Sequence, residues 1–169
     1  MKNLTLCGAL LATGAILSAQ PSPKETATGS IGGKEVTIKY SAPSVKGRKI
    51  FGDGGLVMKD PGAPVWRAGA NSATALHAAG DIKIGDLAVP AGDYTLFVDV
   101  KEENQWTLIV SKETGQWGLA YKPANDLGKV KMKMSKPPAL VETLKYTITA
   151  NAIQLEWENH IASVPLSAK

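Results

Sequence analysis

The sequence has one cysteine and two histidines among its 169 residues. One cysteine excludes an internal disulfide, and so few cysteines and histidines argue against a zinc site. Only 20% of the residues are charged, and the formal net charge of +4 is too small to predict nucleic-acid binding. Hydrophobic residues make up 44%, which indicates a globular chain rather than a disordered one. We therefore expect a folded domain without a metal, a cofactor or a nucleic-acid partner.

Long apolar runs are also missing after the first twenty residues. Lys2 precedes an uncharged, largely apolar stretch over residues 4–17, and the small residues Ser18 and Ala19 follow it. This layout is typical of a secretory signal peptide, and the stretch is shorter than the roughly 20 residues that a membrane helix needs. We expect residues 1–19 to be a signal peptide and the mature chain to be exported, to the periplasm or the extracellular space. An N-terminal membrane anchor is the alternative.

The rest of the chain is dominated by a period of two residues. Residues 20–33 are polar and small, and we expect them to form a flexible N-terminal arm. Residues 34–169 contain alternating apolar and polar positions, which are typical of half-buried strands, and no convincing helical period. The predicted strands with the clearest alternation cover residues 36–40, 94–100, 106–111, 130–134, 144–149 and 153–158.

These strands recur every 10–15 residues, with Gly, Pro or Asn between them. The pattern predicts an all-β, single-domain antiparallel β-sandwich of nine or ten strands over residues 34–169, with a jelly roll as its more specific form. A closed barrel is the alternative. Two long irregular stretches, residues 44–64 and 114–128, are expected to be functional loops.

The densest group of polar and aromatic residues lies at residues 66–74. As a strand, this segment would place Trp66 on one face, and Arg67 and Asn71 on the other. Gly69 would leave room between the two polar side chains, either for a ligand or for a carboxylate of the chain itself, because Arg is rarely buried without a partner. The internal carboxylates considered for this role are Glu156, Glu158 and Asp126.

The second irregular stretch carries Trp117 between a glutamine and a glycine, with Tyr121 four residues later. An aromatic ring on a loop offers a platform for a sugar or another hydrophobic ligand, although it can equally close the end of a sandwich. Arg48 lies in the basic cluster at residues 46–49, at the start of the first long loop. The predicted ligand-binding residues are Arg67, Asn71, Trp117, Tyr121 and Arg48, and no catalytic or metal-binding residue is predicted.

Several segments together resemble a known bacterial family. They are VTIKYSAPSVKGRKIFG (36–52), VWRAGANSAT (65–74), VPAGDYTLF (89–97), QWG (116–118) and Trp157-Glu158. In this order they resemble the family called DUF2911, over nearly the whole mature chain. The resemblance implies an exported, compact domain and supplies no reaction, cofactor or catalytic residue. It places Arg48, Arg67, Asn71 and Trp117 at signature positions, whereas Ser72 departs from the Glu that the family usually shows.

Three functions are compatible with these observations. The favoured one is a non-catalytic ligand-binding domain of the cell envelope whose ligand is a glycan, with Arg67, Asn71 and Trp117 lining one pocket. The alternative is a purely structural or protein-interaction domain in which the same residues only hold the sandwich together. A hydrolase that uses two carboxylates is a weaker third. The sandwich itself does not decide among the three functions, because one fold supports many functions.

Overall fold

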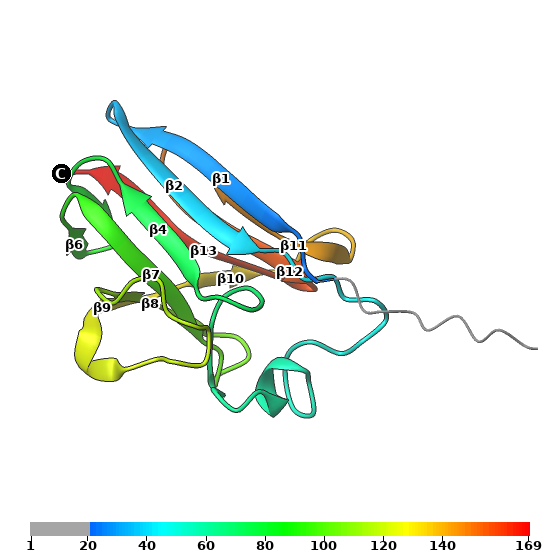
Figure 1. The fold of residues 1–169 in the computed structure, drawn as a ribbon. Helices are drawn as coiled ribbons and strands as arrows, with labels where there is room; N and C mark the ends of the chain where they lie inside the picture. Colours follow the sequence, from blue (N-terminus) through cyan, green and yellow to red (C-terminus); the bar gives the residue numbers. More distant parts are fainter. Residues whose placement is uncertain (1–20) are drawn as a thin grey trace, which may run out of the picture.

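A computed structural model describes residues 21–169 of the chain, and strands account for nearly all of its regular structure (Figure 1). The only helical segments among these residues are two single 3₁₀ turns, η1 (Val57–Lys59) and η2 (Pro123–Asn125). The strands are β1 (Lys24–Ile31), β2 (Lys34–Ser41), β3 (Val65–Trp66), β4 (Thr74–Ala78), β5 (Ile82–Ile84), β6 (Leu87–Val89), β7 (Gly92–Asp99), β8 (Thr107–Ser111), β9 (Asp126–Lys131), β10 (Lys133–Ser135), β11 (Val141–Ile148), β12 (Ala152–Glu158) and β13 (His160–Ala168).

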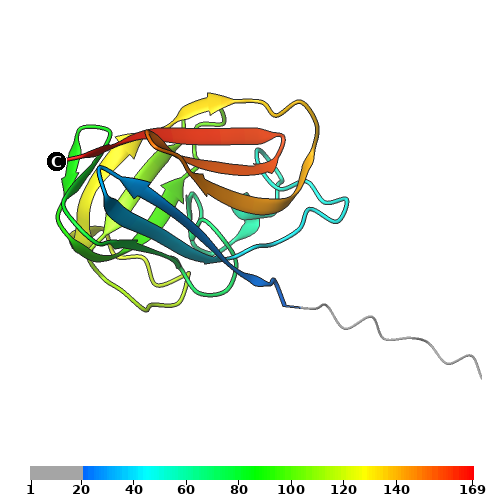
Figure 2. The same cartoon turned by 90° about the horizontal axis from the view of Figure 1, so that it is seen from above.

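The strands form two antiparallel sheets that pack face to face, which confirms the predicted all-β sandwich (Figures 1 and 2). The first sheet has the order β1-β2-β4-β7-β8-β9, with β3 paired to β7. The second sheet has the order β11-β12-β13-β5-β6, with β10 paired to β13. β1 lies beside β11 at one side of the sandwich, where Gly29 fits closely against Ile148.

Alternation along the strands decides which side chains enter the space between the sheets. Val36 and Ile38 of β2 are fully buried, whereas Lys39 between Ile38 and Tyr40 is exposed. The core ends in an aromatic group around Phe51, whose ring contacts Trp66, Trp106, Trp157 and His160 at centroid distances of 4.5–5.6 Å. Aromatic pairs at these distances stabilise a core beyond the area that they bury.

The expected flexible arm is wrong for most of its length. Residues Lys24–Ile31 form β1, and each of them pairs with a residue of β2. The two strands are joined by Gly32 and Gly33, which both have positive φ and suit the tight hairpin turns that follow the twist of a β-ribbon. Thr, Ala, Gly and Ser occupy most of β1, so its alternation of apolar and polar residues is too weak to read in the sequence.

Other differences from the predicted strands have local causes. The predicted strand 130–134 is divided at Met132, because β9 belongs to the first sheet and β10 to the second. The strands β4, β5, β6 and β13 were not among those that the alternation predicted. Within residues 21–169 no helix has the length and apolar character needed to cross a bilayer. The signal peptide predicted for residues 1–19 lies outside the described residues.

Candidate functional site

The predicted strand at residues 66–71 is wrong beyond its first residue. β3 ends at Trp66, and the chain then turns through Ala68 (φ 54°) and Asn71 (φ 62°). Left-handed backbone is unfavourable for a residue with a Cβ atom, by roughly 1–2 kcal/mol, so surrounding contacts must hold this loop. Strained backbone of this kind is concentrated at functional sites in proteins, which makes the loop a candidate site.

Three buried side chains hold the loop in place. The indole Nε1 of Trp66 donates to the carbonyl of Gly69 at 3.1 Å. The carbonyl of Ala68 accepts two hydrogen bonds, from the hydroxyl of Thr74 at 2.9 Å and from the hydroxyl of Tyr146 at 3.0 Å. Burial raises the pKa of Tyr146, so its hydroxyl stays protonated and remains a donor. The loop is therefore fixed by the two buried residues that flank it, Trp66 and Thr74, and by Tyr146 from a distant strand.

Arg67 leaves this loop toward an internal carboxylate, but not one of those predicted. Its guanidinium forms an ion pair with Asp60, and the two side chains are 12% and 25% exposed. A second guanidinium nitrogen donates to the carbonyl of Asn71 at 3.4 Å. An arginine has five N–H groups, so three of those of Arg67 have no partner among the described residues.

The carboxylates predicted as partners of Arg67 are engaged elsewhere. Glu158 accepts a hydrogen bond from the backbone N–H of Ile50 at 2.8 Å. Glu156 pairs with Lys145 at 3.2 Å. Asp126 accepts a hydrogen bond from Tyr121 at 2.8 Å. Asp60 was not predicted as the partner of Arg67. It lies in the irregular stretch at residues 44–64, where no alternation of apolar and polar residues indicates how a side chain points.

Arg67 and Asn71 line one cavity of about 340 Å³, here called the Arg67 cavity. Its wall also contains Lys59, Asp60, Leu56 and the stacked indoles of Trp66 and Trp157, whose ring centres are 5.7 Å apart. The Nε1 of Trp157 is buried without a hydrogen-bond partner among the described residues. Buried polar groups of folded proteins are nearly always paired, so this N–H, which other protein atoms cover, is unusual.

Trp117 lies next to the Arg67 cavity without lining it. Its neighbour Gly118 donates its N–H to the carbonyl of Asn71 at 3.1 Å, and a Cβ atom on Gly118 would overlap Cδ of Arg67. Trp117 itself forms a β-bridge with Ser72, and it is 54% exposed, more than any other large hydrophobic residue described. The structure thus places Arg67 and Asn71 in one cavity wall, whereas Trp117, which was predicted to line the same pocket, lies in the adjoining segment, here called the rim.

The other two predicted ligand-binding residues lie elsewhere. Tyr121 packs its ring on Phe97 at 5.0 Å, and burial together with its hydrogen bond to Asp126 raises its pKa. Arg48 donates to the carbonyls of Val45 and Ser44, at 3.0 and 2.6 Å, and so closes its own loop. Neither lines the Arg67 cavity.

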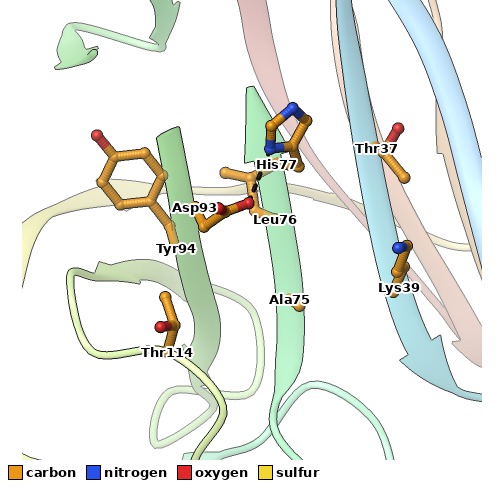
Figure 3. A pocket seen from close by; sticks show the side chains of 8 residues that line it. All are labelled: Thr37, Lys39, Ala75, Leu76, His77, Asp93, Tyr94 and Thr114. Atoms are coloured by element: carbon orange, nitrogen blue, oxygen red, sulfur yellow. Dashed lines mark hydrogen bonds and ion pairs between the residues drawn. The ribbon is translucent and has the colours of Figure 1, made fainter. Parts of the chain in front are cut away.

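A second hollow, which the sequence did not indicate, lies on the outer face of the first sheet. Two cavities of about 560 and 410 Å³ share Lys39 and Ala75, and together they form what we call the sheet groove. Figure 3 shows its first half, where Nδ1 of His77 lies 2.7 Å from Oδ1 of Asp93. Part of its floor belongs to β4, a strand that was not predicted, and this is why the groove was missed.

A comparison with protein families identifies the chain. A family model described as "Protein of unknown function (DUF2911)" matches residues 22–166. The chain belongs to the DUF2911 family. No curated protein and no solved structure matches it significantly. The resemblance expected from the sequence is thereby confirmed, and the function of this DUF2911 protein must be argued from its own residues.

Proposed function

We propose that this DUF2911 protein is an exported, non-catalytic binding domain that recognises a glycan of the cell envelope through the Arg67 cavity. The observation that carries the proposal is the excess of donors around that cavity. Arg67 has three N–H groups without a described partner, and Lys59 adds an ammonium group to the wall. Asp60, the one carboxylate in the wall, is already occupied by Arg67 and by the N–H of Gly62.

An excess of donors favours a ligand that is rich in acceptors. Sugar hydroxyls, carboxylates and acetamido carbonyls are such acceptors, and an arginine fork binds a carboxylate with two parallel hydrogen bonds. A volume of about 340 Å³ lies within the range of small-ligand sites. The exposed indole of Trp117 at the rim adds a flat surface on which the C–H face of a sugar ring can stack. We therefore expect an oligosaccharide with a uronic or an acetamido sugar.

The test is calorimetric titration of the protein with glucuronic acid-containing and N-acetylglucosamine-containing oligosaccharides. Trp117→Ala should weaken binding about tenfold, because the rim platform is lost while the core is untouched. Leu140→Ala is the matched control, since Leu140 is 52% exposed and does not line the Arg67 cavity. Equal affinities of the two variants, or no heat from any oligosaccharide of either class, would contradict the proposal.

One observation favours a protein-interaction domain as the second candidate. Four of the five exposed large hydrophobic residues lie in the segments 56–58 and 117–119, beside the Arg67 cavity. Leu119 of the second segment reaches Gly62, close to the first. If a protein partner covers this end, Met58→Glu should abolish capture of that partner. Met58 is exposed and does not line the Arg67 cavity, so Met58→Glu should leave glycan affinity unchanged if the first proposal holds.

A further inference from the structure

The sheet groove lies on β2, β4 and β7 in the interior of the first sheet and reaches the edge strand β1, and cross-strand register orders its side chains. Thr37 of β2 stands opposite His77 of β4, and His77 stands opposite Asp93 of β7. In the next row Lys39 stands opposite Ala75. Directly opposed residues place their side chains on the same face of a sheet. The groove is therefore a regular polar surface and not an accidental gap between loops.

The groove is open because a neighbouring loop covers only half of the face. Residues 112–125 lie over β7 and β8, where Tyr121 packs on Phe97 and the hydroxyl of Thr95 donates to the Oε1 of Gln116 at 3.1 Å. The edge of this cover, at Thr114, Gly115 and Gln116, forms one wall of the groove. Ala75 in the floor is small, so no large side chain fills the centre of the groove.

Donors and acceptors are balanced along the groove. Lys24 and Lys39 are donors only, and neither has an ion-pair partner among the described residues. Glu25 and Asp93 are acceptors only, so the formal charges of the lining cancel. Because Asp93 can only accept, Nδ1 of His77 is the donor of this pair. The hydroxyl of Thr37 can do both.

This balance fits an uncharged ligand rich in hydroxyl groups. A hydroxyl both donates and accepts, so it can use lysines, carboxylates and threonines alike. A net charge on the ligand would find no excess of opposite charge in the lining. Nucleic acid, which needs a cationic track and exposed stacking rings, fits poorly. A peptide strand fits poorly as well, because β2 and β4 are already paired on both sides and the outer edge of β1 lies beside β11.

The length of the groove favours a chain over a single sugar. Lining residues of β2 run from Thr37 to Ser41, four residue steps that span about 13 Å at the strand rise of ~3.3 Å per residue. We infer that the sheet groove is a second binding site, distinct from the Arg67 cavity, that takes a segment of a neutral polysaccharide. The inference does not depend on the glycan proposed for the Arg67 cavity.

The experiment is a titration of the protein with neutral oligosaccharides of one to six glucose units. Three linkages are compared, those of the cello-, laminari- and malto-oligosaccharides. We expect affinity to rise with length up to about three units for at least one linkage. Ala75→Tyr should weaken this binding at least tenfold by filling the floor, and since Ala75 is exposed the fold should be retained. Lys39→Met should weaken it about fivefold, whereas Lys83→Met, at an exposed strand position of β5, should have no effect.

Three outcomes would overturn the inference. They are the absence of binding with every linkage, binding that Ala75→Tyr leaves unchanged, and tighter binding of poly-glutamate or polygalacturonate than of the neutral series. Arg67→Met and Trp117→Ala separate this site from the Arg67 cavity. Loss of neutral-oligosaccharide binding in these two variants, with full retention in Ala75→Tyr, would assign the ligand to the Arg67 cavity and refute a second site.

Discussion

The carbonyl of Ala68 offers a quantitative test of how the Arg67 loop is held. Thr74 and Tyr146 each donate a hydrogen bond to this one buried oxygen, and no other donor to it is described. Removing one donor, in Thr74→Val or in Tyr146→Phe, leaves the carbonyl with a partner. Each single variant should therefore lose about 1 kcal/mol of unfolding free energy, the usual net value of one hydrogen bond.

The double variant should behave differently. With both donors gone the carbonyl is buried without a partner, which adds a desolvation cost of about 1–3 kcal/mol. We expect a total loss of about 4 kcal/mol, roughly twice what additivity predicts, because Thr74 and Tyr146 share an acceptor. For a chain of this length each kcal/mol corresponds to about 2–4 °C in melting temperature.

The assay is urea unfolding of the four proteins, with Thr107→Val as a control. Thr107 lies in β8 and no hydrogen bond of its side chain is described, so its loss should stay within about 0.5 kcal/mol. The double variant should also bind glycan less well than either single variant, since the same oxygen fixes the loop between Arg67 and Asn71. A double variant whose loss equals the sum of the single losses would refute the reasoning.

Two further predictions concern the surroundings of the site. Gly118→Ala should destabilise the fold by about 1–3 kcal/mol and move Arg67, because the new Cβ would overlap Cδ of Arg67 and the carbonyl of Asn71. The melting temperature and the glycan affinity should both fall. An unchanged affinity would show that this contact is irrelevant to binding. Burial against Phe51 and Trp106 lowers the pKa of His160 below its ordinary value of 6.5. As the pH falls, the unfolded chain takes up the proton on this histidine before the folded chain does. The stability that neutral His160 contributes is therefore complete above pH 6.5 and is lost as the pH falls through the lowered pKa. Between pH 7.5 and pH 5, the unfolding free energy of His160→Gln should fall less than that of the native chain.

The strands that sequence predicted well share one property. In β2 and β12, β-branched, aromatic or other large apolar residues alternate with polar ones, and one face of each strand is buried. β1 and β4 are built from smaller residues, so their faces differ too little in hydrophobicity to reveal the period. Their places are decided by pairing with β2, which is a tertiary contact.

The candidate site was predicted in composition but not in geometry. Arg67 and Asn71 were recognised from their types and spacing, yet the segment around them was read as a strand. Its turn depends on Tyr146, 78 residues away from the carbonyl that it holds. The partner Asp60 comes from a loop without a period. Local patterns carry no information about such contacts, and so neither the turn nor the ion pair was predicted.

Glycan binding at the Arg67 cavity can be followed through the indole N–H signals of the four tryptophans in a ¹⁵N NMR titration. With an oligosaccharide that contains glucuronic acid or N-acetylglucosamine, we expect the signals of Trp157 in the wall and Trp117 at the rim to shift together. The signal of Trp106, which does not line the Arg67 cavity, should stay in place. Unmoved signals of Trp117 and Trp157, or an equal shift of Trp106, would show that the glycan does not bind at this cavity.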